Sequence, residues 1–124
     1  MKQKFYRCEN CGKIVALVKE TGIPVFCCGM PMKQLSAGTT EASVEKHVPV
    51  YTREGNILTV EVGSTIHPME KAHHIEWISI QTNYGNQRKA ITVEAHPSAQ
   101  FALLDGEEVE AVYAYCNLHG LWKA

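Results

Sequence analysis

The stretch Ile57-Leu58-Thr59-Val60-Glu61-Val62 decides the fold class, because apolar and polar residues alternate along it from position 58 onward. A period of two is typical of a strand that buries one face in a core and exposes the other. The β-rich run from His47 to Arg53 precedes it, with the turn residues Glu54-Gly55-Asn56 between the two. Together these segments predict a β-hairpin.

Further β-rich runs follow the hairpin and are separated by turn-forming residues. They are Ile75 to Gln81, Arg88 to Glu94, Ala99 to Leu104 and Val109 to Cys116, with turn signals at Asn83-Tyr84-Gly85-Asn86, His96-Pro97 and Asp105-Gly106. Short strands at this spacing favour an antiparallel β-sandwich that is immunoglobulin-like in architecture only, because the cysteine pair of true immunoglobulin domains is missing. We expect little helix beyond one turn near Pro68 to Ala72.

Composition excludes several classes of function. The 124 residues are 45% hydrophobic and 20% charged, as in ordinary globular proteins. A net charge of −1 with scattered lysines creates no field that would attract nucleic acid. The chain has no apolar run near the roughly 20 residues of a membrane span, and Met1-Lys2-Gln3-Lys4-Phe5 does not open a signal peptide. We therefore expect a cytoplasmic protein that binds neither nucleic acid nor a membrane.

The first 36 or so residues differ in character from the rest. They are rich in glycine, proline and cysteine, so only short strands fit, such as Lys13 to Val18. Segments below about 40 residues usually need a metal, a disulfide or a partner chain to fold. A reducing compartment disfavours disulfides, so we expect a metal here. The small polar run Ser36 to Thr40 predicts a linker, and we expect domains at 1–37 and 38–124.

Four of the five cysteines lie in this first segment. Cys8 and Cys11 have the two-residue spacing of a metal-binding knuckle, in which Gly12 permits the positive φ that the bend requires. Cys27 and Cys28 are adjacent, so we expect them to complete a distorted tetrahedron. Four thiolates suit zinc or iron, and the ligand type does not separate the two metals. A plain structural zinc site is the simplest alternative.

The fifth cysteine, Cys116, precedes His119 by three residues, and His47, His67 and His73 lie upstream. One thiolate with several neutral imidazoles suits a redox-active transition metal better than a closed zinc site. Because neighbours on a strand point to opposite faces, only one of His73 and His74 can face such a site, and alternation does not choose between them. A blue-copper site is the competing reading, but no methionine follows His119 as its axial ligand.

These motifs together resemble the desulfoferrodoxin family, which are superoxide reductases with an added rubredoxin-type domain. The matching segments are Cys8-x-x-Cys11 with Cys27-Cys28, Glu45-Lys46-His47-Val48-Pro49, His67-Pro68-Met69 with His73 and Ile75-Glu76-Trp77-Ile78, and Cys116-Asn117-x-His119-Gly120-Leu121-Trp122. They occur in order over nearly the whole sequence. The resemblance implies a mainly β chain, in which a small rubredoxin-like, metal-stapled domain precedes an immunoglobulin-like antiparallel β-sandwich.

The resemblance also implies the metals and their ligands. It implies a four-cysteine iron centre in the first domain and a mononuclear ferrous ion in the second. Around the second iron it places an equatorial square of histidines and an axial cysteine, namely His47, His67, His73, His119 and Cys116. It thereby selects His73 over His74, which stands where we would expect an aromatic residue. We expect His74 and His96 to be surface or satisfied core residues.

The implied reaction is the one-electron reduction of superoxide to hydrogen peroxide, with electrons from rubredoxin or a similar donor. The resemblance implies that Lys46 flanks the opening, and we assign proton supply to Lys46 and water. It also implies that Glu45 caps the sixth position of ferric iron. We further expect a homodimer formed by strand pairing. Two other functions compete with this one, a pure electron carrier, two-iron or cupredoxin-like, and a zinc-stapled binding module.

Overall fold

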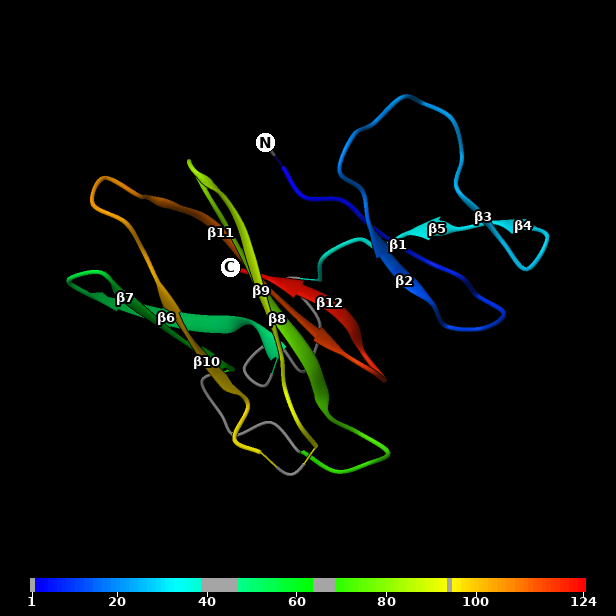
Figure 1. The fold of residues 1–124 in the computed structure, drawn as a ribbon. Coiled ribbons are helices and arrows are strands. Elements are labelled where there is room, and N and C mark those ends of the chain that lie inside the picture. The colour runs from blue at the N-terminus through cyan, green and yellow to red at the C-terminus, as the bar shows by residue number, and fades with distance from the viewer. Residues whose placement is uncertain (1, 39–46, 64–68, 94) are drawn as a thin grey trace. The chain divides into compact units, whose positions relative to one another are not determined.

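The computed structural model describes residues 2–38, 47–63, 69–93 and 95–124. The named elements of these residues are all β-strands (Figure 1), which confirms the mainly β class. The chain divides into two compact units, Met1–Ser36 and Ala37–Ala124. Within the described ranges, no residues form a helix with the length and apolar character that crossing a bilayer requires.

The first unit is built from five very short strands. β1 (Phe5–Arg7) lies between β2 (Ile14–Ala16) and β5 (Lys33–Gln34) in a three-stranded antiparallel sheet, while β3 (Phe26–Cys27) and β4 (Met30–Pro31) form a separate hairpin. Its buried apolar side chains, among the residues described, are Phe5, Cys8 and Met32. Because few side chains are buried, hydrophobic burial contributes little free energy of folding here. This unit therefore needs another source of stability.

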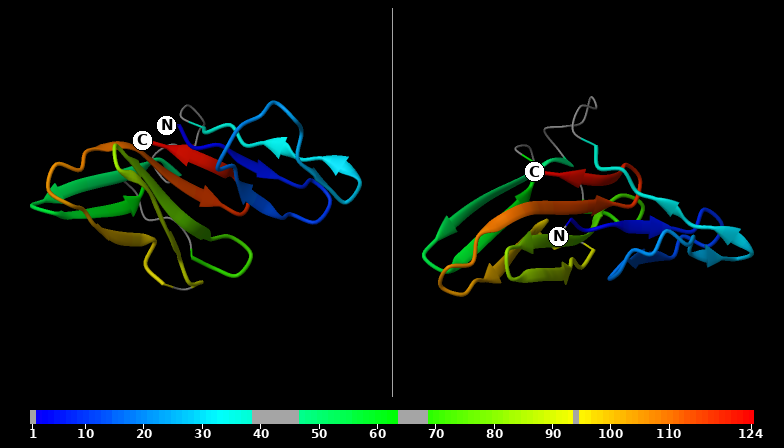
Figure 2. Two further views of the ribbon diagram at one scale, coloured as in Figure 1. Left: turned by 45° about the horizontal axis from the view of Figure 1, so that its top comes forward. Right: turned by 90° about the horizontal axis from the view of Figure 1, so that it is seen from above.

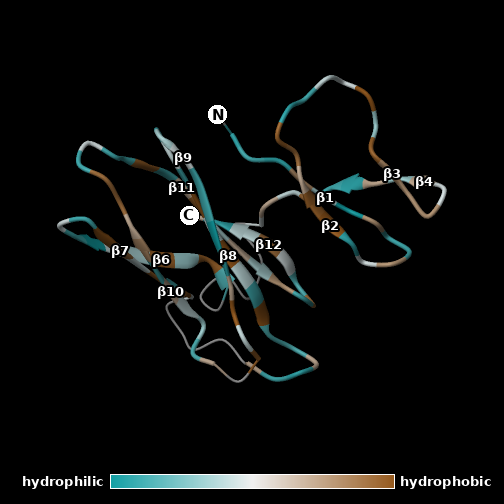
Figure 3. Ribbon diagram, in the orientation of Figure 1, coloured by the Kyte–Doolittle hydropathy of each residue, from teal (hydrophilic) through white to brown (hydrophobic). Residues whose placement is uncertain are grey.

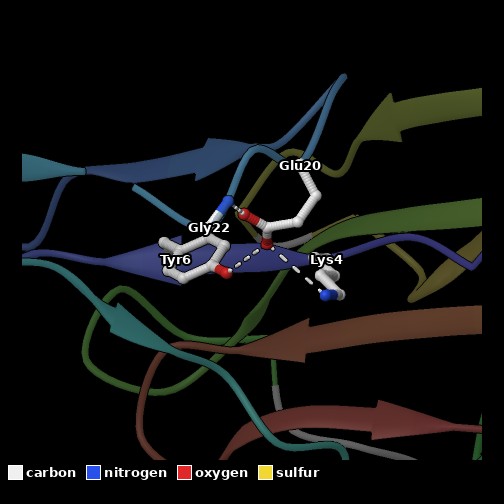
Figure 4. A network of polar contacts seen from close by, with 4 residues as sticks. All are labelled: Lys4, Tyr6, Glu20 and Gly22. Carbon is white, nitrogen blue, oxygen red and sulfur yellow. Dashed lines mark hydrogen bonds and ion pairs between the residues drawn. The ribbon is translucent and has the colours of Figure 1, made fainter. Parts of the chain in front are cut away.

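A carboxylate fastens the loop between β2 and β3 to strand β1 (Figure 4). Glu20 accepts hydrogen bonds from the Gly22 amide at 2.7 Å and from the Tyr6 hydroxyl at 3.3 Å. The Lys4 ammonium lies 3.4 Å from the same carboxylate. These contacts, led by the Gly22 amide, lower the pKa of Glu20. The pair with Lys4 is exposed to water, so the loop is held mainly by the hydrogen bonds.

The second unit is a sandwich of two antiparallel sheets (Figure 1, Figure 2). One sheet has the order β10-β7-β6, formed by Ser98–Ala102, Ile57–Val62 and Pro49–Glu54. The other has the order β12-β11-β8-β9, formed by Gly120–Lys123, Val109–Cys116, Ile75–Thr82 and Gly85–Ala90. The sequence predicted this architecture from the spacing of its β-rich runs.

The core lies between the inner faces of the two sheets. The buried residues of β7 and Phe101 on the adjacent strand β10 pack against the inward residues of β8 and β11. Each fully buried large apolar side chain contributes about 1.5–3 kcal/mol. The complete cluster is Leu58, Val60, Val62, Ile75, Ile78, Ile80, Phe101, Leu103, Val112, Ala114 and Cys116. Cys116 therefore belongs to the core and to a candidate metal centre at once.

Some strand boundaries differ from those predicted. The strand predicted at Arg88 to Glu94 has the wrong bounds: β9 runs from Gly85 to Ala90, because the hairpin turns on Asn83-Tyr84 alone and pairs Thr82 with Gly85. Residues 91–93 are not in a strand, and Glu94 lies outside the described residues. Figure 3 shows β9 as hydrophilic, so it carries no apolar pattern that could fix its register. Strand β12 was not predicted. The expected helical turn near residues 68–72 lies partly outside the described residues, and Lys71-Ala72 form an ordinary turn.

Candidate metal centres

Four sulfur atoms of the first unit converge on one point. The Sγ atoms of Cys8, Cys11, Cys27 and Cys28 all lie within 4.8 Å of one another, and none of these cysteines forms a disulfide. Two neighbouring distances are 3.7 Å, between Cys11 and Cys27, and 3.9 Å, between Cys27 and Cys28. Sulfurs bound to one tetrahedral ion at about 2.3 Å lie about 3.8 Å apart. The spacing therefore fits a single zinc or iron ion.

Backbone amides in the β1–β2 turn are directed at the first sulfur. The Cys11 amide donates to Cys8 Sγ at 3.4 Å, and the Gly12 amide donates to the Cys8 carbonyl at 2.9 Å. Gly12 has a φ of 81°, as the predicted knuckle requires. The Cys11 amide is the main reason that the pKa of Cys8 falls to about 6, whereas hydrogen bonds, first to Cys11, raise that of Cys27 to about 12. Binding a metal would release the proton that Cys27 retains.

The adjacent cysteines reach the same point because the backbone leaves the extended conformation between them. Successive side chains of a strand point to opposite faces, so Cys27 and Cys28 could not both face one ion within a regular strand. Cys28 has a φ of 54°, in the left-handed region that costs a non-glycine residue about 1–2 kcal/mol. The adjacent pair thus places strain in the backbone at Cys28, where ion binding can compensate for it.

A second group of donor atoms lies at one end of the sandwich. The ligand atoms of His47, His73, Cys116 and His119 are all within 4.8 Å of one another. His47 and His73 come shortly before β6 and β8, Cys116 ends β11, and His119 lies in the turn between β11 and β12. Three segments far apart in the sequence therefore bring four donors to a common point, and the segment at the end of β11 supplies two of them.

The rings of this group face one another closely. The centroid of His119 lies 4.7 Å from that of His47 and 4.9 Å from that of His73. His119 Nδ1 is 3.1 Å from His47 Nε2 and 3.8 Å from Cys116 Sγ. Two ring nitrogens at such a distance repel each other unless a proton or a cation lies between them. This geometry, with one soft donor and several borderline ones, fits a first-row transition metal.

Cys116 is fully buried, and burial is the main reason that the pKa of its thiol is raised. The amides of His119 and Leu118 point toward the sulfur and oppose that shift, while the nearby Glu76 carboxylate adds to it. A bound cation would reverse the balance, because a metal stabilises the thiolate far more than amide dipoles do. The pocket is thus built for a thiolate that is paired with a positive charge.

Trp122, on the unpredicted strand β12, supports the ring of His47. The indole and the imidazole stack at 4.8 Å between centroids, with 17° between their planes. Gly38 packs on the same indole, where a Cβ would lie 3.2 Å from the ring, and its amide donates to the Leu121 carbonyl at 2.7 Å. Only glycine fits here without moving the tryptophan. The sequence carried one signal of this support, the position of Trp122 three residues after His119.

The other predicted residues are placed as follows. Glu45, Lys46 and His67 lie outside the described residues. His74 lies apart from the group, with its Nδ1 2.9 Å from the Glu70 carbonyl. His96 is exposed, with its Nε2 4.0 Å from Glu61. The structure thus brings together four of the five donors that the sequence assigned to the second centre.

Comparisons with known proteins agree with this geometry. The family model "Desulfoferrodoxin" matches residues 39–124, and "Desulfoferrodoxin, N-terminal domain" matches residues 1–35. A desulfoferrodoxin homolog of Archaeoglobus fulgidus is 44% identical over 96% of this chain and 94% of its own length. The desulfoferrodoxin of Nitratidesulfovibrio vulgaris is 40% identical over 98% and 94%.

A solved structure matches over both units. The superoxide reductase from Treponema pallidum is 31% identical, covers 99% of this chain and 97% of its own, and superposes with a TM-score of 0.85. The four-sulfur group and the group of imidazoles around Cys116 both suit iron, so the residues present fit a protein with two iron centres. On these matches, the chain belongs to the desulfoferrodoxin family.

Proposed function

We propose that this chain is a superoxide reductase, which reduces superoxide by one electron, with two protons, to hydrogen peroxide. The observation that carries the proposal is the convergence of three imidazoles and the Cys116 thiol at one end of the sandwich. We assign His47, His67, His73, His119 and Cys116 as ligands of a catalytic iron. The family membership and the names of the relatives, among them the superoxide reductase from Pyrococcus horikoshii, support this assignment.

Bound ferrous iron would supply the single electron and an open position for the substrate. The chain's ligands set the local charge: one thiolate and neutral imidazoles around a divalent ion would leave about +1, which attracts an anion. The whole chain has a net charge of −1, so this attraction must be local. We propose that Lys46 adds to it, since a positive charge 4 Å from an anion is worth about 1 kcal/mol in water and more where water is excluded.

The thiolate has a second role beyond charge. We propose that Cys116 donates electron density to the metal, as the cysteine of haem-thiolate enzymes does. The amides of Leu118 and His119 that point at the sulfur withdraw part of that density. Formation of hydrogen peroxide with its oxygen–oxygen bond intact consumes two protons for each superoxide. We assign this proton delivery to Lys46 with water, and propose that Glu45 occupies the open position of the oxidised site.

Several features of the proposal rest on the sequence and the family resemblance. These are a domain division at 1–37 and 38–124, iron bound by Cys8, Cys11, Cys27 and Cys28, an electron donor of the rubredoxin type, a homodimer, and a cytoplasmic role in superoxide detoxification under oxidative stress. The exposure of Cys11 and Cys28 supports the idea that the first centre can exchange electrons at the protein surface.

Metal analysis combined with spectra before and after addition of superoxide tests the function. We expect two irons per chain, a visible spectrum from the four-cysteine centre, a second band when the other centre is oxidised, and one hydrogen peroxide per superoxide. Colourless protein with zinc alone would favour a binding module, and an intense blue copper band a cupredoxin. Protein that contains two irons but forms no peroxide from superoxide would favour an electron carrier.

Exchange of Lys46 for isoleucine tests the steering. We expect slower superoxide capture and a flatter dependence of the rate on salt, because screening then acts on a smaller local charge. Lys13→Ile in the first unit changes the net charge equally and serves as the control. Equal rates and equal salt slopes in the two variants would count against a local role for Lys46.

A further inference from the structure

The paired strands β8 and β11 are closed at both ends by an asparagine that makes the same three hydrogen bonds. At the metal end, Asn117 directly follows β11. Its amide nitrogen donates to the His74 carbonyl at 3.2 Å, its Nδ2 donates to the Ala72 carbonyl at 3.0 Å, and its Oδ1 accepts from the His74 amide at 2.8 Å. The Asn117 side chain thus binds the backbone of Ala72 and His74, two residues that precede the partner strand.

At the opposite end, Asn83 directly follows β8 and repeats the arrangement. Its amide nitrogen donates to the Glu108 carbonyl at 3.1 Å, its Nδ2 donates to the Gly106 carbonyl at 3.1 Å, and its Oδ1 accepts from the Glu108 amide at 2.7 Å. The residues gripped are again two apart and precede the partner strand. The two ends are therefore related as if by a two-fold axis through the strand pair.

We call each asparagine with its three hydrogen bonds a clip, the Asn117 clip and the Asn83 clip. The β8–β11 ladder between the two clips has the same symmetry. Its pairing shifts once near each end, between Val109 and Ala111 and between Tyr115 and Cys116. Each shift leaves one glutamate without a partner in the ladder, Glu110 in β11 and Glu76 in β8. Such bulges turn the side chains beside them and are common next to functional sites. The backbone pairing and the asparagine hydrogen bonds are thus alike at the two ends. The two ends differ in whether candidate metal ligands lie beside the asparagine.

The metal end carries ligands on both sides of its clip. Asn117 immediately follows Cys116 and precedes His119 by two residues, while the residues that it grips flank His73 on either side. His73 is held further by its own backbone, whose amide and carbonyl pair with those of Glu70 at 3.1 Å and 2.8 Å. A single amide group therefore connects the segment of one ligand to the segment of two others. The Asn83 clip holds no member of the group.

We propose that Asn117 is a positioning residue of the candidate iron centre, and that it sets the distance from His73 to Cys116 and His119. This inference rests on the proposed function, because it assumes that these residues ligate one metal. Metal–ligand bonds tolerate only about 0.2 Å of error, so ligands from separate turns need a rigid connection. Only an amide side chain offers the acceptor and the donor, side by side, that this edge requires.

The matched variants Asn117→Asp and Asn83→Asp test the proposal in the full-length protein. Each replaces an NH₂ group by an oxygen that faces a carbonyl, with the same change of charge. We expect Asn117→Asp to shift the thiolate-to-iron absorption band and to lose iron from the second centre to a chelator about tenfold faster or more, as loss of an outer-sphere partner does elsewhere. Asn83→Asp should match the wild type in both. The four-cysteine spectrum serves as an internal standard.

The pair Asn117→Ser and Asn83→Ser removes both side-chain bonds without adding charge and should give the same contrast. Unfolding of the sandwich, followed by tryptophan fluorescence after chelation, should show similar losses of stability in the two. Equal iron release and unshifted bands in all four variants would overturn the proposal. So would a larger loss of stability in the metal-free Asn117 variants, because Asn117 would then serve the fold. Wild-type protein without iron in the second centre would refute the proposed function instead.

Discussion

The two candidate metal centres differ in what holds their ligands in place. The four cysteines belong to a unit of 36 residues whose described apolar core is Phe5, Met32 and one of the ligands, Cys8. The second group lies at the end of a sandwich whose core of buried aliphatic and aromatic side chains runs through both sheets. In the first unit, metal binding would supply the stability that a hydrophobic core usually provides. In the second unit, the hydrophobic core would keep the ligands in place.

Local geometry shows the same contrast. Around the cysteines the backbone accommodates the ion, with a left-handed Cys28 and an amide directed at Cys8. Around the histidines, residues that are not ligands fix the geometry, through the stacked Trp122 and the Asn117 clip. Loss of the ion should therefore unfold the first unit and leave the second largely intact. The following predictions test this difference.

The largest effect should follow from Cys8→Ala. Structural metal sites of this kind contribute roughly 10–16 kcal/mol of binding free energy, which for so small a unit is folding free energy. We expect loss of the four-cysteine absorption and of dispersed NMR signals from residues 2–36, while the sandwich signals and the second metal remain. An ordered first unit in metal-free Cys8→Ala protein would show that the unit folds on its own contacts.

The reciprocal change, Cys116→Ser, should remove a function and leave the fold. Serine has nearly the same shape, so the sandwich should keep its NMR spectrum, but an oxygen donor cannot give a thiolate-to-iron charge-transfer band. We expect that band and superoxide-dependent peroxide formation to disappear, while the four-cysteine spectrum is unchanged. Survival of the band would refute the assignment of Cys116 as a ligand of the second iron.

Sequence patterns predicted those strands in which burial imposes a regular alternation. β7 was predicted at its observed bounds because alternate residues of it are buried in the core. β11 was also predicted at its bounds, although its last six residues are all buried, because turn-forming residues and a β-rich composition delimit it. β9 was placed wrongly because an exposed edge strand has no apolar period to reveal its register. β12 was missed because it is only four residues long and begins at Gly120, a residue type that is typical of turns.

The sequence predicted the candidate metal ligands, but it did not predict the residues that hold them in place. Alternation could not choose between His73 and His74, because His73 lies in a turn closed by Glu70 and not in a strand. The family resemblance made that choice. The roles of Asn117 and Trp122 depend on which residues lie across the ladder, and pairing of this kind is set by tertiary structure that no local pattern encodes.

A smaller effect should come from the core itself. Phe101 is fully buried between the sheets, so Phe101→Ala should destabilise the sandwich by about 3–5 kcal/mol. Chemical denaturation followed by tryptophan fluorescence measures this loss. Phe26→Ala in the first unit is the control, because Phe26 is 62% exposed. If the two centres are held as described, Phe101→Ala should leave the four-cysteine spectrum unaltered up to the unfolding transition; a parallel loss of that spectrum would contradict their independence.

The smallest effect concerns the end of the sandwich that lacks ligands. The buried Glu107 carboxylate accepts from Thr82 Oγ1 at 2.6 Å and from the Leu104 amide at 2.9 Å, and Arg53 is nearby. The Thr82 hydrogen bond is the main reason that the pKa of Glu107 lies below its ordinary value of 4.5. A carboxyl whose pKa is lower in the folded state stabilises the fold above its unfolded pKa, and this stability is lost as pH falls through the folded pKa.

We therefore expect Glu107→Gln to lower the sandwich's resistance to denaturant slightly at pH 7, and to have a weaker effect at pH 4 and below. Glu108→Gln, an exposed neighbour with the same change of charge, should alter neither value. Metal affinity also falls in acid, because protons compete for thiolates and imidazoles. The comparison must therefore be made on protein stripped of the second metal. A loss of stability in Glu107→Gln that is equal at both pH values would mean that packing, and not the carboxylate's charge, gives Glu107 its effect.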